Sequence, residues 1–128
     1  MDTSRIGLLI VLLGVLALTS VGLHASGPHS EKQTLTGTLV DITCATDPKR
    51  NLTKLRSEHT RRCLLMPICA ESGYALLTDG DEVLRFDGKG NELARKLIEK
   101  HSHTQSWRVS IEGTIQGDQL KLERIRLL

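Results

Sequence analysis

Three cysteines and one histidine lie in a single stretch of this sequence, in the order Cys44, His59, Cys63 and Cys69. Their spacing is C-x14-H-x3-C-x5-C. Three thiolates and one imidazole make a complete tetrahedral set of ligands for zinc, and soft sulfur donors also suit Cu(I). On a helix, His59 and Cys63 would share one face, because residues four apart are neighbours on a helix surface. We therefore predict a zinc or copper site formed by these four residues.

The same cysteines could instead form one disulfide bond. A disulfide from Cys44 to Cys63 or Cys69 would close a loop worth about 3 to 4 kcal/mol. It would leave the third thiol free for a disulfide-linked dimer or a redox-sensitive role, whereas a metal site uses all three cysteines. Against the metal site, the spacing lacks the paired C-x2-C ligands typical of zinc sites. The alternatives are therefore a metal site, redox-sensitive thiols, or a disulfide-stapled structural or partner-binding module with no metal.

The sequence carries no motif of an established catalytic class. It has no G-x-S-x-G, no H-E-x-x-H and no C-x-x-C. Its 17 Lys and Arg residues against 15 Asp and Glu give a formal net charge of +2, which excludes a strongly basic nucleic-acid binder. Its only aromatic residues are Tyr74, Phe86 and Trp107, too few for a base-stacking surface. We expect a non-enzymatic protein without a nucleic-acid partner.

The N-terminus is typical of an export signal. After Arg5 the chain is almost entirely apolar from 6 to 23, and small residues such as Ala25 precede a polar stretch. This pattern is typical of a secretory signal peptide, and the apolar run is also just long enough to span a membrane. We expect residues 1–25 to be a cleaved signal peptide or an N-terminal membrane anchor. The protein would then be periplasmic or extracellular, or held in the inner membrane by residues 6–23.

Short strands must position the cysteine and histidine side chains. We expect a linker at 26–33 and one domain at 34–128. Alternating apolar residues predict strands at 34–44, 74–78, 82–87, 107–115 and 120–128. An amphipathic pattern predicts a helix capped by Asn91 and ending near His101. A weaker helical pattern covers 51–63, and Pro67 should end any helix there.

This order of elements predicts the fold class. The order along the chain is a strand, a segment that carries the cysteines, two strands, a helix and two strands. Five short strands with a helix between the third and fourth are typical of an OB-like small barrel. We therefore predict a mainly β domain with one or two short helices. The alternative is an open α+β sheet packed by one helix.

Several motifs of this chain together resemble a known group of proteins. They are G-x-x-x-D-x-x-C ending at Cys44, H-x3-C beginning at His59, M-P-x-C ending at Cys69 and S-G-Y ending at Tyr74, followed by the segments at 86–91 and 109–113. This pattern resembles a group of short exported bacterial proteins of unknown function. The similarity covers nearly all of the chain after the N-terminal segment. The resemblance implies an exported OB-like domain with a Cys/His cluster, and the group has no established activity to transfer.

Overall fold

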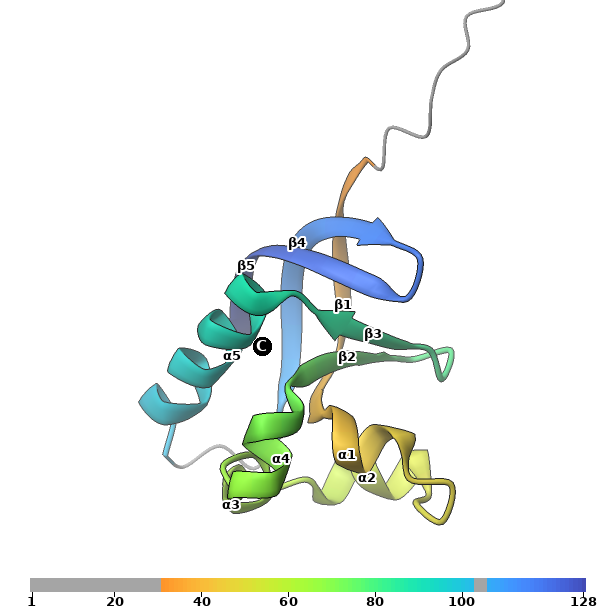
Figure 1. Cartoon of the computed structure of the whole chain (residues 1–128), viewed down its shortest axis with the longest axis vertical. Coiled ribbons are helices and arrows are strands. Elements are labelled where there is room, and N and C mark those ends of the chain that lie inside the picture. The colour runs from red at the N-terminus through yellow and green to blue at the C-terminus, as the bar shows by residue number, and fades with distance from the viewer. Residues whose placement is uncertain (1–30, 103–105) are drawn as a thin grey trace, which may run out of the picture.

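Five strands close into a barrel in the computed structural model, which describes residues 31–102 and 106–128. The strands are β1 (Lys32–Asp41), β2 (Tyr74–Thr78), β3 (Val83–Phe86), β4 (Arg108–Gln116) and β5 (Gln119–Leu127) (Figure 1). Their order around the barrel is β1-β2-β3-β5-β4, and β4 pairs with β1 to close it. All neighbouring strands are antiparallel except β3 and β5, which are parallel. The mainly β class and the five-stranded barrel are confirmed, and the alternative of an open sheet is wrong.

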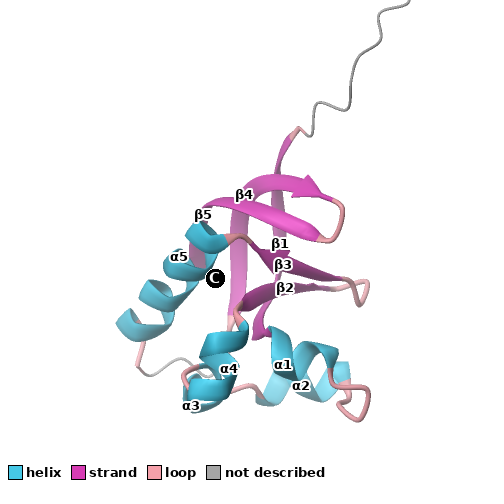
Figure 2. Ribbon diagram, in the orientation of Figure 1, coloured by secondary structure: helices cyan, strands magenta, loops and turns pink. Residues whose placement is uncertain are grey.

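The helices of the described residues outnumber the one or two that we predicted. They are α1 (Ile42–Thr46), α2 (Leu52–Glu58), α3 (Arg61–Leu64), α4 (Pro67–Ser72) and α5 (Gly88–Lys100). The first four lie between β1 and β2 and gather at one end of the barrel, whereas α5 lies beside the strands (Figure 2). The first four have 5, 7, 4 and 6 residues, which is too short for a helical period to be visible in the sequence.

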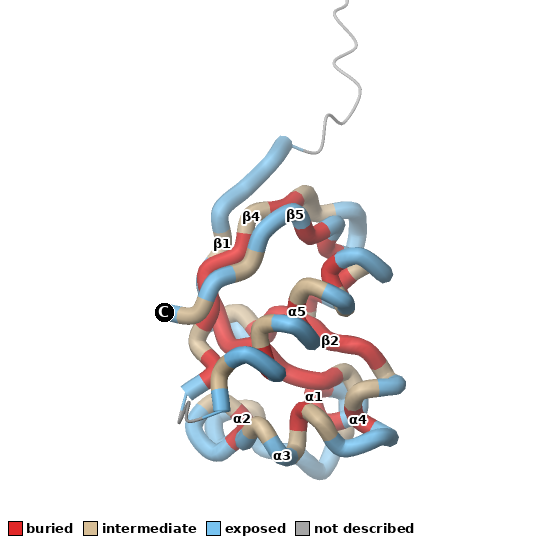
Figure 3. The backbone as a smooth tube through the Cα atoms, turned by 90° about the vertical axis from the view of Figure 1, so that its left-hand side faces the viewer, coloured by how far each residue is buried: buried red, intermediate tan, exposed pale blue. Residues whose placement is uncertain are grey.

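The strands β1 and β2 are buried on both faces near the helical end of the barrel (Figure 3). Successive side chains of a strand point to opposite faces, so Leu39 and Leu76 enter the barrel core while Val40 and Leu77 enter a second core. The barrel core also contains Tyr74, Phe86, Ile98, Trp107, Val109, Ile111, Leu120 and Leu122. The second core contains Cys44, Ala45, Leu55, Cys69 and Ala75. Two of the three cysteines are therefore core residues.

The N-terminal expectations fall mainly outside the described residues. Residues 1–25, expected to be a signal peptide or anchor, are not among them, and neither is most of the expected linker. Lys32 and Gln33, expected in that linker, are the first residues of β1 and pair with Thr114 and Gly113. Within the two described ranges, no helix is both long enough and apolar enough to cross a membrane.

Candidate metal centre

A carboxylate and two thiols come together where β1 leads into α1. One ligand atom from each of Asp41, Cys44 and Cys69 lies within 4.8 Å of the other two. All three residues are buried, and Asp41 has no exposed surface at all. Asp41 is the last residue of β1, Cys44 lies in α1 and Cys69 lies in α4. We call these three residues the buried group.

A capping hydrogen bond places Cys44 beside Asp41. The Cys44 N–H donates to Oδ1 of Asp41 over 2.8 Å, so Asp41 is the N-cap of α1 and ends β1. The predicted strand from 34 to 44 is therefore wrong at its end, because the chain turns into a helix after Asp41. Our sequence prediction missed Asp41 as a candidate ligand. The available signal was an aspartate three residues before Cys44, which is the spacing of an N-cap from the amide that it accepts.

The helix α4 carries the second thiol against α1. The N–H of Ile42 donates to the Gly73 carbonyl over 3.0 Å, and the N–H of Thr43 donates to the Ser72 hydroxyl over 3.1 Å. These bonds tie the first turn of α1 to the end of α4. We expected Pro67 to end any helix of the preceding segment, and α3 does end before it, at Leu64; Pro67 also begins α4, which the sequence pattern did not predict. Proline fits the first turn of a helix because the amide that it lacks would have no partner there.

His59 meets the buried group through Asp41. Its Nε2 lies 2.9 Å from Oδ2 of Asp41, and the two side chains are 2% and 0% exposed. The two atoms lie at ion-pair distance when His59 is protonated, and within the described residues neither of them has another hydrogen-bond partner. Oδ2 of Asp41 thus faces the imidazole, while Oδ1 caps α1.

Cys63 is the predicted ligand that lies apart from the buried group. It is half-buried in α3, and its sulfur accepts a hydrogen bond from the Thr60 hydroxyl over 3.2 Å. All three cysteines are free thiols in this structure. The structure therefore brings Cys44 and Cys69 together, places His59 against Asp41, and leaves Cys63 outside the group defined by the 4.8 Å separation.

Asp41 carries the negative charge of the buried group, because both thiols keep their protons. Burial raises the pKa of the Cys44 thiol to about 12, and the negative charge of Asp41 adds to the rise. Burial and Asp41 also raise the pKa of Cys69. Burial alone would raise the pKa of Asp41, but its interactions with His59 and with Cys44 outweigh that effect and lower it. Both thiols are thus protonated at neutral pH, and a metal that binds them must displace their protons.

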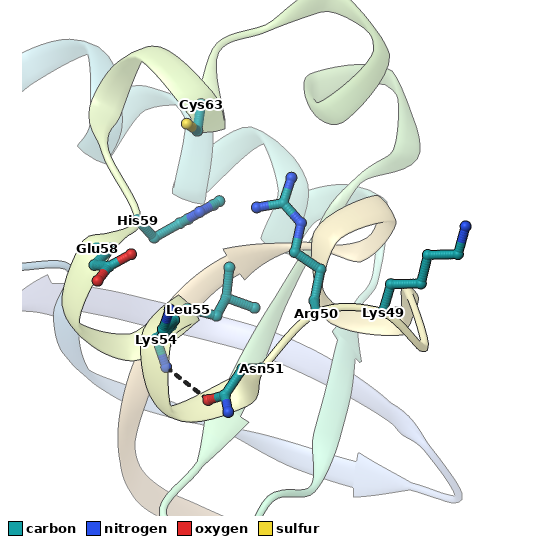
Figure 4. A pocket seen from close by; sticks show the side chains of 8 residues that line it. All are labelled: Lys49, Arg50, Asn51, Lys54, Leu55, Glu58, His59 and Cys63. Carbon is teal, nitrogen blue, oxygen red and sulfur yellow. Dashed lines mark hydrogen bonds between the residues drawn. The ribbon is translucent and has the colours of Figure 1, made fainter.

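A basic pocket lies beside the buried group (Figure 4). Its volume is about 410 Å³, and it is lined by Lys49, Arg50, Asn51, Lys54, Leu55, Glu58, His59 and Cys63. The guanidinium of Arg50 points toward the side of the pocket where His59 and Cys63 lie, whereas Lys49 points away (Figure 4). His59 lines this pocket and also contacts Asp41, so it links the pocket to the buried group.

The donor atoms of the buried group determine its possible chemistry. Two sulfurs and one carboxylate oxygen suit zinc, and the sulfurs also suit Cu(I). A nucleophilic role fits less well, because a reactive cysteine needs a lowered thiol pKa and an accessible sulfur, whereas Cys44 and Cys69 are buried with raised pKa values.

No family model, no curated protein and no solved structure matches this chain.

Proposed function

We propose that this protein is an exported, non-enzymatic OB-like module that binds one zinc or Cu(I) ion through Cys44, Cys69 and Asp41. The observation that carries the proposal is the convergence of these three buried side chains within 4.8 Å. The OB-like assignment is supported by the strand order β1-β2-β3-β5-β4 with α5 between β3 and β4. Export is supported by the apolar N-terminal pattern of the sequence, and the periplasm is the compartment that we propose.

The spacing of the buried group suits a small thiophilic ion. Tetrahedral zinc with sulfur and oxygen ligands places neighbouring ligand atoms about 3.6 to 3.8 Å apart. The ligand atoms of Asp41, Cys44 and Cys69 already lie within 4.8 Å, so small side-chain movements would bring them into range. Calcium and magnesium instead require six or more oxygen ligands or several waters, which this sulfur-rich group does not provide.

His59 has a positioning role in this proposal. A ligand carboxylate keeps its orientation when a neighbouring group holds it, and loss of such a neighbour typically weakens metal binding about 10- to 100-fold. His59 lies 2.9 Å from the carboxylate oxygen of Asp41 that the cap of α1 does not use. The proposed site thus retains Cys44 and Cys69 from the predicted ligands and adds Asp41.

Competition with a coloured chelator tests this ligand set. The reduced protein is titrated with Zn²⁺ or Cu(I), and Cys44→Ser, Cys69→Ser and Asp41→Asn are compared with Cys63→Ser as the matched control. We expect one bound ion, a loss of affinity greater than about 100-fold in the two cysteine variants, a clear loss in Asp41→Asn, and little change in Cys63→Ser. Absence of metal binding in the unmodified protein would overturn the function. An equal loss in Cys63→Ser would instead favour the four ligands predicted from the sequence.

A disulfide between Cys44 and Cys69 is the second candidate. Their sulfurs lie within 4.8 Å of each other, and an oxidising compartment would favour their joining. The bond would staple α1 to α4 and stabilise the protein by about 3 to 4 kcal/mol, giving a structural or partner-binding module. Mass spectrometry without reductant separates the candidates. A metal-free mass lower by two hydrogens supports the disulfide, whereas three intact thiols with one bound metal support the metal site.

A further inference from the structure

The pocket beside the buried group carries an excess of positive charge. Among the described residues, Lys49, Arg50 and Lys54 line it together with one carboxylate, Glu58. Within the described residues, neither lysine forms an ion pair, and the single ion pair of Arg50 joins its Nε to Asp47 over 3.9 Å at the surface. The two side chains of that pair are 52% and 41% exposed, so water screens it. The positive charge of the pocket is therefore largely uncompensated.

The shape and lining of the pocket suit a small ligand. Its volume of about 410 Å³ lies in the range of small-molecule sites, which is roughly 300 to 1,000 Å³. Cations gathered around a concave surface produce a focused positive potential that attracts anions. Leu55 gives the wall an apolar part, and the buried His59 and half-buried Cys63 give it polar atoms. An anion of several heavy atoms would fit this lining better than a single halide ion.

Arg50 determines which kind of anion would be recognised. Its guanidinium points toward the side of the pocket where His59 and Cys63 lie (Figure 4), and its side chain is 52% exposed. A planar guanidinium binds carboxylate or phosphate oxygens in pairs, whereas a lysine ammonium contributes a point charge. Arg50 would therefore provide geometric recognition, and Lys49 and Lys54 would add attraction that grows with the charge of the ligand.

We propose that this pocket binds a small multivalent oxyanion, a polycarboxylate or a phosphate, through Arg50 with help from Lys49 and Lys54. This inference goes beyond the proposed metal function and does not depend on it, because none of Asp41, Cys44 and Cys69 lines the pocket. The three cations and one carboxylate of the lining leave an excess of two positive charges, which favours a ligand with two or more negative charges.

Nuclear magnetic resonance titration tests the proposal. The amide signals of Arg50 and Lys54 are followed while inorganic phosphate, citrate or acetate is added at constant ionic strength. We expect saturable binding of phosphate and citrate and binding of acetate about tenfold weaker, equivalent to about 1.4 kcal/mol. Tighter phosphate binding would identify the ligand as a phosphate, and tighter citrate binding would identify it as a polycarboxylate. Shifts that do not saturate with any of the three anions would overturn the proposal.

Charge variants distinguish a specific anion site from nonspecific electrostatic attraction. Arg50→Gln and Lys54→Gln should weaken binding about tenfold, or about 1.4 kcal/mol. Glu58→Gln should strengthen it, because it removes the one competing carboxylate of the pocket. Lys96→Gln makes the same charge change on the exposed surface of α5 and should have little effect. Equal weakening in Lys96→Gln and Lys54→Gln, or no effect of Glu58→Gln, would contradict the proposal.

The variant Cys44→Ser tests whether anion binding depends on metal binding. This variant removes a proposed metal ligand and leaves every residue that lines the pocket in place. If it binds citrate or phosphate like the unmodified protein, the pocket acts independently. Anion binding that occurs only in zinc-loaded protein would show that the anion is a ligand of the metal, and this would overturn the pocket site. Failure of metal binding alone would leave anion binding unchanged.

Discussion

Asp41 combines local and tertiary roles in one side chain. Its Oδ1 accepts the amide of Cys44 and starts α1, while its Oδ2 faces His59. A fully buried carboxylate is costly unless neighbouring groups compensate its charge. The lowered pKa of Asp41 shows that its polar neighbours outweigh its burial. At the residue scale, the site therefore depends on how well this one charge is compensated.

Removal of the imidazole should destabilise the protein. In His59→Ala, Oδ2 of Asp41 loses its close neighbour and stays buried, so we expect the free energy of unfolding to fall by about 2 to 3 kcal/mol. Urea denaturation followed by the fluorescence of the buried Trp107 measures this change. The half-buried His101 at the end of α5 provides the control, and His101→Ala should change stability by less than about 0.5 kcal/mol. Equal effects of the two variants would show that the contact with Asp41 has no energetic role.

The charge of Asp41 should also appear in the pH dependence of stability. Its pKa in the folded protein is lower than the ordinary value of 3.8. Its contribution to the free energy of unfolding is therefore present above pH 3.8 and is lost as the pH falls through the folded pKa. Asp79 and Glu123 also have lowered pKa values, because they form hydrogen bonds with Arg108 and Lys32 respectively. They therefore add to the loss of stability at low pH.

Comparison with Asp41→Asn isolates the part that Asp41 contributes. The difference in free energy of unfolding between the two proteins should be constant near neutral pH and should shrink below pH 3.8. Denaturation curves at a series of pH values measure it. A difference that stays constant through the acid range would mean that Asp41 has the same pKa in the folded and unfolded states.

At the scale of elements, side-chain caps define the helices more than periodicity does. Asp41, Asn51, Thr60 and Asp87 each accept an amide hydrogen bond at the start of a helix. We expected Asn91 to cap the last helix, but Asp87 does so and α5 begins earlier. Asn91 lies inside α5, and its side chain accepts the amide of Tyr74, which a pattern along one segment cannot show.

The strands were easier to predict because their alternation is local. The apolar phase of the last strand slips at Glu123 and Arg124, which indicates a bulge. In the structure, Glu112 pairs with Arg124 while Gly113 pairs with Leu122, so Glu123 is the additional residue and the prediction is confirmed. The buried group was harder to predict because Asp41, Cys44 and Cys69 meet through the packing of α1 on α4. Their spacing along the chain does not determine this contact.

Two glycines of α5 give a matched test of its packing on the barrel. A Cβ at Gly90 would lie 2.8 Å from Cβ of Leu122 and 2.9 Å from Cβ of Phe86, whereas a Cβ at Gly88 would meet no atom within 4 Å. We expect Gly90→Ala to lower the free energy of unfolding by about 1 to 3 kcal/mol through overpacking. Gly88→Ala should instead raise it by up to about 0.5 kcal/mol, because alanine favours the helix. Thermal unfolding measures both, and a stable Gly90→Ala variant would mean that α5 can move away from β5.

At the scale of the whole molecule, the barrel and the helical end share β1 and β2. Both strands contribute to the barrel core on one face and to the second core on the other. The barrel closes through long antiparallel pairings, but its parallel seam between β3 and β5 has only two paired positions. Stability should therefore be uneven, with the seam opening more readily than the pairing of β4 with β5.

Metal binding should stabilise one part of this uneven structure. Because Asp41, Cys44 and Cys69 lie at the end of β1, in α1 and in α4, a bound ion must be released before these elements separate. At free zinc about 100-fold above the dissociation constant, opening should cost about 2.7 kcal/mol more, which slows hydrogen exchange about 100-fold. The slowed amides should lie in α1 and α4, while seam amides that open without breaking the site should exchange as before.

Hydrogen exchange with and without zinc measures this difference between the helices and the seam, and Cys44→Ser should abolish it. Equal slowing of the seam and the helices would show that the ion acts only on global unfolding, so that α1 and α4 do not open on their own.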